Sequence, residues 1–195
     1  MVHLVKGVLN GVIVASTPRF ADNRGAFTVT FEEKAAAGLG VPTHFVQDNL
    51  SVSDRPGTIR GIHLQLPPYA QGKLVRVLRG RIADLVVDLR PTSPSYRRHE
   101  LIELGAAGGE VLWVPPGFGH GFCTLEPDTE VFYKVDAPYA PSAERTLAWD
   151  DPTVGVPWPV LDVTPDGRPT LSDRDRTNPT LADLVRRLRS EESSG

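Results

Sequence analysis

The sequence predicts an all-β fold, a barrel or a sandwich of short strands, and three observations support this. Short runs rich in valine, isoleucine, leucine and aromatic residues recur along most of the chain, separated by turn-forming residues. Glycine and proline number 18 each in 195 residues, which favours many turns over long helices. Helical periodicity is confined to two segments, so strands alternating with helices are not expected.

The expected strands show either period-two alternation or short, continuous apolar runs. They span residues 11–16, 26–31, 44–53, 58–65, 73–78, 81–89, 99–104, 110–114, 119–125, 130–135 and 145–148. Arg79 and Gly80 separate two valine- and leucine-rich runs, and they predict the tight turn of a hairpin. Short helices are expected at residues 32–39 and 181–188, the second carrying an apolar stripe of Leu181, Leu184, Val185 and Leu188.

The length and the lack of internal repeats or linkers predict a single domain over residues 1–188. The polar run over residues 189–195 is expected to be a disordered tail. Cys123 is the only cysteine, so no intrachain disulfide can form, and a reducing compartment is expected. No apolar run approaches the ~20 residues of a membrane span, so the cytoplasm is the expected location.

The net charge of −3 argues against general binding to nucleic acids or to membrane surfaces. The charge is uneven, however, because residues 54–98 carry nine lysines and arginines against three aspartates. A basic solvated face would explain this excess, and a site for an anion would explain it equally well. The basic residues alternate with polar strand positions, which keeps the anion site open as an interpretation.

Residues 45–75 combine strand-like patterning with polar side chains that suit a binding site. Gln47, Asn49 and Ser51 share one face of the expected strand, whereas Val46, Leu50 and Val52 share the other. His63 and Gln65 likewise point the same way from the next strand, and Lys73 begins the one after. An imidazole, amides and an ammonium on inward faces suit a barrel interior that holds a small anionic molecule.

Two short motifs resemble the halves of a cupin metal site. The run WVPPGFGHGF contains Pro115, Gly117 and His120 with the spacing of the second half, and GIHLQ resembles the first. Gln65 stands where a metal-binding cupin carries a second histidine, so His63 and His120 lack the usual partner ligands. A jelly roll of the cupin type is therefore expected without a metal, and no dinucleotide fingerprint indicates another cofactor.

Proton transfer is the chemistry that the polar residues can support. His63 can act as a base near neutral pH, with Asp175 of the run LSDRD as its orienting acid. Tyr133 can supply a proton, and Lys73 can stabilise an enolate formed next to a ketone. Structural roles are the alternative, because Tyr133 could satisfy a hydrogen bond at a sheet edge and Asp175 could cap the following helix.

The chain resembles the dTDP-4-dehydrorhamnose 3,5-epimerases from about Val12 to Asp175. The motifs that carry this resemblance occur in order: FVQDNLSVS, IRGIHLQ, QGKLVRV, GRIADLVVDLRPTSPSY, VPPGFGHGF, VFYKVDAPYAP, AWDDPTVGVPWP and LSDRD. The resemblance implies a metal-free, cupin-like jelly roll that forms a homodimer whose subunits lend residues to each other's sites. It also implies epimerisation at C3 and C5 of a dTDP-4-keto-6-deoxy sugar.

The resemblance also implies roles for individual residues. His63 matches the base of the family, Asp175 its charge partner, Tyr133 the acid and Lys73 the group that holds the 4-keto oxygen. The positions that match substrate-binding residues are Arg24, Gln47, Asn49, Arg60, His120, Tyr139, Glu144 and Arg174. Among these, the fork of Arg60 suits the diphosphate and the ring of Tyr139 suits stacking on thymine.

One position departs from the family pattern. Val29 stands where the family commonly carries a glutamate that contacts the nucleotide base. An apolar side chain cannot accept the imide N–H of thymine, so weaker selection of the base is expected.

Three alternatives to a 3,5-epimerase stay open from the sequence. A related enzyme could invert only C3 or only C5, and a cupin-type ketoisomerase would use similar enolate chemistry. A non-catalytic sugar-binding cupin would share the fold without the reaction. The joint occurrence of His63, Asp175, Tyr133 and Lys73 argues against the binding module, which needs no acid and base together.

Overall fold

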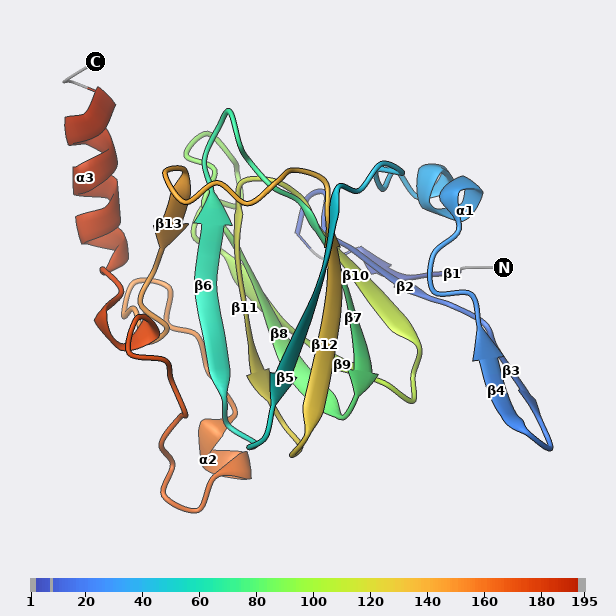
Figure 1. Ribbon diagram of the computed structural model, residues 1–195. Coiled ribbons are helices and arrows are strands. Elements are labelled where there is room, and N and C mark those ends of the chain that lie inside the picture. The colour runs from blue at the N-terminus through green and yellow to red at the C-terminus, as the bar shows by residue number, and fades with distance from the viewer. Residues whose placement is uncertain (1–2, 8, 193–195) are drawn as a thin grey trace.

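The computed structural model describes residues 3–7 and 9–192, and two antiparallel β-sheets that face each other form its body (Figure 1). In the order of their pairing, the strands of the six-stranded sheet are β1 (His3–Gly7), β2 (Ile13–Ser16), β10 (Glu110–Val114), β7 (Lys73–Arg79), β12 (Thr129–Val135) and β5 (Gln47–Ser53). Those of the five-stranded sheet are β13 (Glu144–Thr146), β6 (Ile59–Gln65), β11 (Phe118–Thr124), β8 (Arg81–Asp88) and β9 (His99–Gly105).

The smaller elements lie around this body. A separate hairpin of β3 (Arg19–Asp22) and β4 (Gly25–Thr28) projects from it at one side (Figure 1). The helical segments are α1 (Glu33–Gly38), α2 (Val160–Val163), the 3-10 helix η1 (Asp175–Thr177) and α3 (Leu181–Glu192). Within residues 3–7 and 9–192 there is no helix with the length and apolar character needed to cross a bilayer.

From β5 to β13 the chain passes from one sheet to the other between successive strands, as in a jelly roll, except that β8 and β9 are neighbours in one sheet. β5 and β7 belong to the six-stranded sheet, whereas β6 and β8 belong to the five-stranded one. The all-β, jelly-roll prediction is therefore confirmed.

The hairpin predicted at Arg79 and Gly80 is wrong, although the tight turn exists. Gly80 has a φ of 76°, a conformation that glycine adopts without strain, but β7 and β8 do not pair with each other. The turn instead carries the chain between the two sheets. Two apolar runs joined by a tight turn have the same local sequence pattern whether the strands pair in a hairpin or belong to different sheets. The pattern does not show which strands share hydrogen bonds.

Apolar side chains from the two inner faces form the main core. The six-stranded sheet contributes Val75, Val77 and Val131, and the five-stranded sheet contributes Ile82 and Val86. These residues recur at every second position because alternate side chains of a strand point to the same face. Removing this apolar surface from water is the main force that holds the two sheets together.

The outer face of the five-stranded sheet is covered by the C-terminal segment. Leu181 of α3 packs with Ile62, Leu85 and Val87, side chains that point away from the main core. The boundary predicted for the tail is wrong, because α3 continues through residue 192 and residues 193–195 lie outside the described residues. Arginine and glutamate are good helix formers, so a polar continuation can extend a helix that packing has already fixed.

Two other departures concern the N-terminal part of the chain. The sequence does not predict β1 and β3, and the strand expected over residues 26–31 ends at Thr28 as β4.

The apolar face of β5 is on the outside of the body, where Leu50 is 58% exposed and Val52 is 50% exposed. The six-stranded sheet therefore leaves apolar side chains uncovered at the edge formed by β5.

Candidate active site

The residues predicted to carry the chemistry meet in one cleft between the two sheets. The cleft has a volume of about 700 Å³ and is open to solvent. Of the predicted site residues, those that line it are Arg60, His63, Lys73, His120, Tyr133, Arg174 and Asp175. Five of the seven lie on strands of the two facing sheets. The polar strand positions seen in the sequence therefore form one lining.

His63 on β6 is paired with Asp175 at the start of η1. The His63 Nε2 lies 2.8 Å from Asp175 Oδ1, which leaves Nδ1 as the other ring nitrogen. Ser172 donates to Asp175 Oδ2 and Asn178 donates to Oδ1. Burial alone would raise the pKa of the Asp175 carboxyl, but the hydrogen bonds from His63, Ser172 and Asn178 lower it. The carboxylate therefore stays charged beside the imidazole.

Asp175 does not cap the helix that follows it, so the structural alternative for this residue is wrong. The N-terminus of α3 is capped by Thr180, whose hydroxyl accepts a hydrogen bond from the backbone N–H of Asp183. The two carboxylate oxygens of Asp175 instead form hydrogen bonds with His63, Ser172 and Asn178.

Tyr133 lies on the sheet opposite His63. On β12 it sits between Asn49 of β5 and Val75 of β7, so its ring points to the inner face. Burial raises the pKa of the Tyr133 hydroxyl, and the nearby positive charge of Arg60 only partly opposes this. The phenol is therefore protonated near neutral pH and can donate a proton.

Lys73 begins β7 and extends into the same cleft. Burial lowers the pKa of its ammonium to about 8, against the opposing effect of the carboxylates of Asp136, Glu144 and Asp84. The side chain is therefore mostly charged at neutral pH but holds its proton less tightly than an exposed lysine does. The Lys73 ammonium can therefore stabilise an oxyanion. It loses its proton at a pH only slightly above neutral.

A second histidine–aspartate pair lies at the inner end of the cleft. His120 on β11 is the cross-strand partner of His63, and its Nε2 lies 2.9 Å from Asp84 Oδ1. Both members of the pair are buried. Sequence reasoning missed Asp84, although a lone acid within the apolar run IADLVV was a visible signal. Buried acids are uncommon unless they are paired.

Three predicted substrate-binding residues, Arg60, Gln47 and Asn49, are held by hydrogen bonds to or along β5, although Gln47 and Asn49 do not line the cleft. Arg60 donates from Nη2 to the carbonyl oxygen of Val52 at 2.9 Å and from Nε to Ser53 Oγ at 3.3 Å. It thereby connects β6 to the edge strand of the other sheet. Gln47 donates to Asn49 Oδ1 at 2.6 Å along that same edge strand.

A second group of predicted residues forms a chain of polar contacts. The Tyr139 hydroxyl donates to Glu144 Oε2 at 2.7 Å, and Arg174 Nη2 lies 2.6 Å from the same oxygen. Burial would raise the pKa of the Glu144 carboxyl, but the hydrogen bonds from Tyr139 and Arg174 hold it below its ordinary value. The ring of Tyr139 is half exposed and free to stack on a planar ligand.

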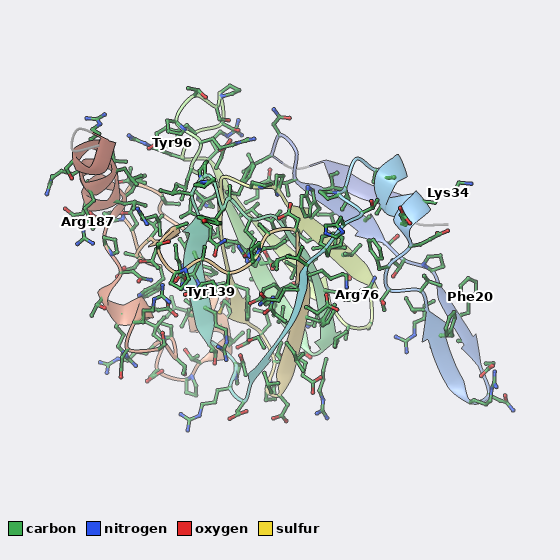
Figure 2. The ribbon with its side chains drawn as sticks, turned by 45° about the horizontal axis from the view of Figure 1, so that its top comes forward. Phe20, Lys34, Arg76, Tyr96, Tyr139 and Arg187 are labelled. Carbon is green, nitrogen blue, oxygen red and sulfur yellow. The ribbon has the colours of Figure 1, made fainter. Side chains whose placement is uncertain are left out.

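Arg24 and Val29 are not brought to this cleft. Arg24 occupies the turn of the β3–β4 hairpin, where its guanidinium pairs with Asp22 at 2.6 Å. Val29 lines a separate pocket with Ile13 and Trp113, away from His63. Figure 2 shows the hairpin, marked by Phe20, far across the molecule from Tyr139. Within one chain, these two predicted residues cannot touch a ligand in the cleft.

Gln65 is engaged in structural hydrogen bonds. Its Nε2 donates to the carbonyl oxygens of Tyr69 and Pro138, and its Oε1 accepts from the backbone N–H of Ala140. It thereby fixes the loops beside β6. Across residues 3–7 and 9–192, no cluster of three histidine, cysteine, aspartate or glutamate side chains is placed to hold a metal ion.

Comparisons with known proteins agree with this arrangement. The family model described as dTDP-4-dehydrorhamnose 3,5-epimerase matches residues 6–183. A protein of that name from Sinorhizobium fredii is 45% identical over 166 residues, which cover 85% of this chain and 83% of the relative. The solved structure of the enzyme from Bacillus anthracis, with TDP and PPi bound, has a TM-score of 0.87 and 41% identity, covering 93% of this chain and all of that one.

The chain belongs to the dTDP-4-dehydrorhamnose 3,5-epimerase family. The predicted class of enzyme, an isomerase that acts on a dTDP-linked sugar, is thereby confirmed. Another similar structure is ChmJ of Streptomyces bikiniensis, a 3'-monoepimerase in complex with dTDP-quinovose. It has a TM-score of 0.82 and 33% identity, covering 92% of this chain and 87% of that one.

Proposed function

We propose that the cleft epimerises dTDP-4-dehydro-6-deoxy-D-glucose at C3 and C5 to give dTDP-4-dehydro-L-rhamnose. In this proposal His63 is the base, Tyr133 is the acid, Lys73 stabilises the enolate and Asp175 orients the imidazole. Family membership gives the reaction, and the geometry of this chain supports the assignment of the roles.

The 4-keto group makes both inversions possible with one set of residues. It acidifies the hydrogens on C3 and C5, so a neutral His63 can remove either proton and become an imidazolium. The electron pair of the broken C–H bond then moves into an enolate whose charge lies on the 4-oxygen, next to the Lys73 ammonium. The Tyr133 hydroxyl returns a proton to the opposite face of the carbon, and solvent restores both residues before the second centre reacts.

The location of the base and the acid on facing sheets is the observation that carries the proposal. His63 is on β6 of the five-stranded sheet, whereas Tyr133 is on β12 of the six-stranded sheet, and both line one cleft. A sugar ring held between the sheets therefore meets the base on one face and the acid on the other. Inversion requires this arrangement, because removal and return of a proton on one face would restore the original centre.

The nucleotide end of the substrate is assigned to residues at the mouth of the cleft. Arg60 would bind the diphosphate through its free guanidinium nitrogen, and Tyr139 would stack on the thymine. Gln47, Asn49, His120, Glu144 and Arg174 would position the remaining polar groups. Arg24 and Val29 would act from a second subunit, because the hairpin of one chain lies far from its own cleft (Figure 2).

Inversion at C3 alone is the second candidate function. The similarity to the 3'-monoepimerase supports it, because that enzyme shares the fold over most of the chain. The residues proposed here as base and acid would serve one centre as well as two. The alternatives therefore differ in which carbons exchange their hydrogen with solvent.

Proton exchange in D2O separates the candidates. The wild-type protein should incorporate deuterium at both C3 and C5 of dTDP-4-keto-6-deoxyglucose, as followed by NMR of the recovered sugar. His63→Ala should abolish incorporation at both positions while keeping the fold, because removal of a general base costs about 10²–10⁴-fold. Incorporation at C3 alone would establish the monoepimerase, and no incorporation by the wild type would leave a binding protein.

Two further proposals accompany the reaction. Metal independence is proposed because the histidine expected of a metal-binding cupin is replaced by Gln65, and turnover should survive exhaustive chelation. Turnover that returned only with an added divalent ion would contradict it. A cytoplasmic location is also proposed, since Cys123 is the only cysteine of the chain.

A further inference from the structure

Asp84 is a buried acid that contacts the cleft only through other residues. It lies on β8 at an inward position, between Ile82 and Val86, and its exposure is 0%. Its carboxylate faces the His120 Nε2, at 2.9 Å from Oδ1 and 3.1 Å from Oδ2. The negative charge of Asp84 also acts on Lys73 of the facing sheet, where it opposes the lowering of the lysine pKa.

The three carboxylates that act on Lys73 differ in what else they do. Asp136 accepts a hydrogen bond from the backbone N–H of Gly72, and Glu144 is held by Tyr139 and Arg174. Asp84 alone among the three is fully buried, and it also fixes a second cleft residue, His120. Its removal would therefore disturb two neighbouring groups of the cleft at once.

We propose that Asp84 is a positioning residue of the reaction, a role that rests on the proposed function. One carboxylate fixes the ring of His120, so that Nδ1 is the nitrogen left for the substrate, and keeps the Lys73 ammonium charged beside the developing enolate. Asp84 itself does not touch the substrate, because it is fully buried and does not line the cleft.

The physical reason is the low polarity of the interior. A buried histidine without an acceptor for its Nε2–H has no preferred ring orientation, whereas the carboxylate selects one tautomer and one orientation. A buried ammonium loses hydration, and a nearby negative charge compensates for part of that loss. The same carboxylate is itself more easily protonated because burial raises the pKa of Asp84, an effect that His120 and Lys73 oppose.

The Asp84→Asn variant tests this role through the pH dependence of the loss. The ratio of wild-type to variant kcat/KM should be about tenfold near pH 6 and should grow further as the pH approaches 8, because the variant loses the Lys73 charge at lower pH. Taking the ratio at each pH cancels the pH dependence that the two proteins share. Affinity for dTDP should change by less than about threefold, since the nucleotide residues are untouched. A ratio that does not change with pH would overturn the proposal.

Asp88→Asn provides the matched control. Asp88 is on the same strand, is equally buried and also points inward, but it is bonded to Arg90, Ser93 and Ser95 outside the cleft. This variant should lose stability without moving the alkaline limb of the activity profile. A shift equal to that of Asp84→Asn would show that loss of any buried charge on β8 has the same effect, and would overturn the specific role.

A measurement on the wild-type protein keeps the proposal testable if Asp84→Asn does not fold. Nitrogen-15 NMR of the histidine rings should show that the His120 Nε2 carries a proton and is hydrogen-bonded. An unprotonated Nε2 would overturn the proposal. Failure of the proposed function would instead appear as a wild-type protein without exchange in D2O, so the two failures are distinguishable.

Discussion

At the scale of single residues, Tyr133 and His63 divide inversion into two steps that can fail separately. Tyr133→Phe keeps the ring and its packing but removes the only proton donor assigned to that sheet. His63 can still form the enolate and return a deuteron to the same face. We therefore expect exchange in D2O to continue while net inversion, most clearly at C5, falls by about 10²-fold or more.

The measurement is NMR of the recovered sugar, which reports deuterium content and configuration together. A Tyr133→Phe protein that inverts C5 at the wild-type rate would remove Tyr133 from the mechanism. Equal losses of exchange and inversion would indicate that the ring only shapes the wall of the cleft.

The lowered pKa of Lys73 predicts the pH above which activity declines. Its pKa is lowered to about 8, so the side chain is an ammonium below that pH and a neutral amine above it. Because the enolate needs the positive charge, kcat/KM should fall as the pH rises through about 8. Lys73→Arg should stay charged and lose this limb, although the larger side chain should lower the maximal rate. An unchanged limb in that variant would assign the titration to another group.

At the scale of elements, Asp151 lies in the loop after β13 and connects that loop to α3 through hydrogen bonds of its side chain. It is buried, and its carboxylate accepts hydrogen bonds from the backbone N–H groups of Thr153, Val154 and Leu181. Leu181 is the first residue of α3, whose N-terminal N–H groups have no partner within the helix. This contact anchors the segment that follows Asp175.

Asp151→Ala should therefore lower the free energy of unfolding by about 2–4 kcal/mol, since several buried N–H groups lose their acceptor. Asp150→Ala, at the exposed neighbouring position, should change it by less than about 0.5 kcal/mol. Chemical denaturation at one fixed protein concentration measures both, because assembly would otherwise contribute to apparent stability. Equal effects in the two variants would contradict the anchoring role.

At the scale of the whole molecule, the β3–β4 hairpin is an arm that pairs with neither of the two main sheets. Phe20 and Phe27 are cross-strand partners, yet they are 59% and 66% exposed. Apolar residues that project this far suit a surface that another molecule covers. This geometry supports the predicted homodimer, in which the arm of one subunit would reach the cleft of the other.

Mixed dimers test the sharing of sites. His63→Ala and Arg24→Glu should each be weakly active, but co-expression should restore about a quarter of wild-type activity, because a hybrid dimer contains one intact site. His63→Ala with Tyr133→Phe is the control, since both residues belong to the cleft of one chain and no intact site can form. Recovery in the control, or none in the test pair, would contradict sites shared through the hairpin.

The sequence alone determined which side chains face inward along most strands. Alternation placed His63, Lys73 and Tyr133 on inward faces, and the structure brings all three into one cleft. It also located most strand boundaries, because turns with glycine and proline interrupt the apolar runs. The exceptions were β1 and β3, whose short segments lack a clear pattern.

Only the tertiary structure decided which strands share a sheet and which polar groups pair. Local alternation cannot distinguish a hairpin from a turn between two sheets, so the sequence predicts a hairpin at Gly80 that the structure does not form. The pairs His63–Asp175 and His120–Asp84 join residues 112 and 36 positions apart. Such contacts depend on how the two sheets close around a common core, and no periodicity within one strand encodes that closure.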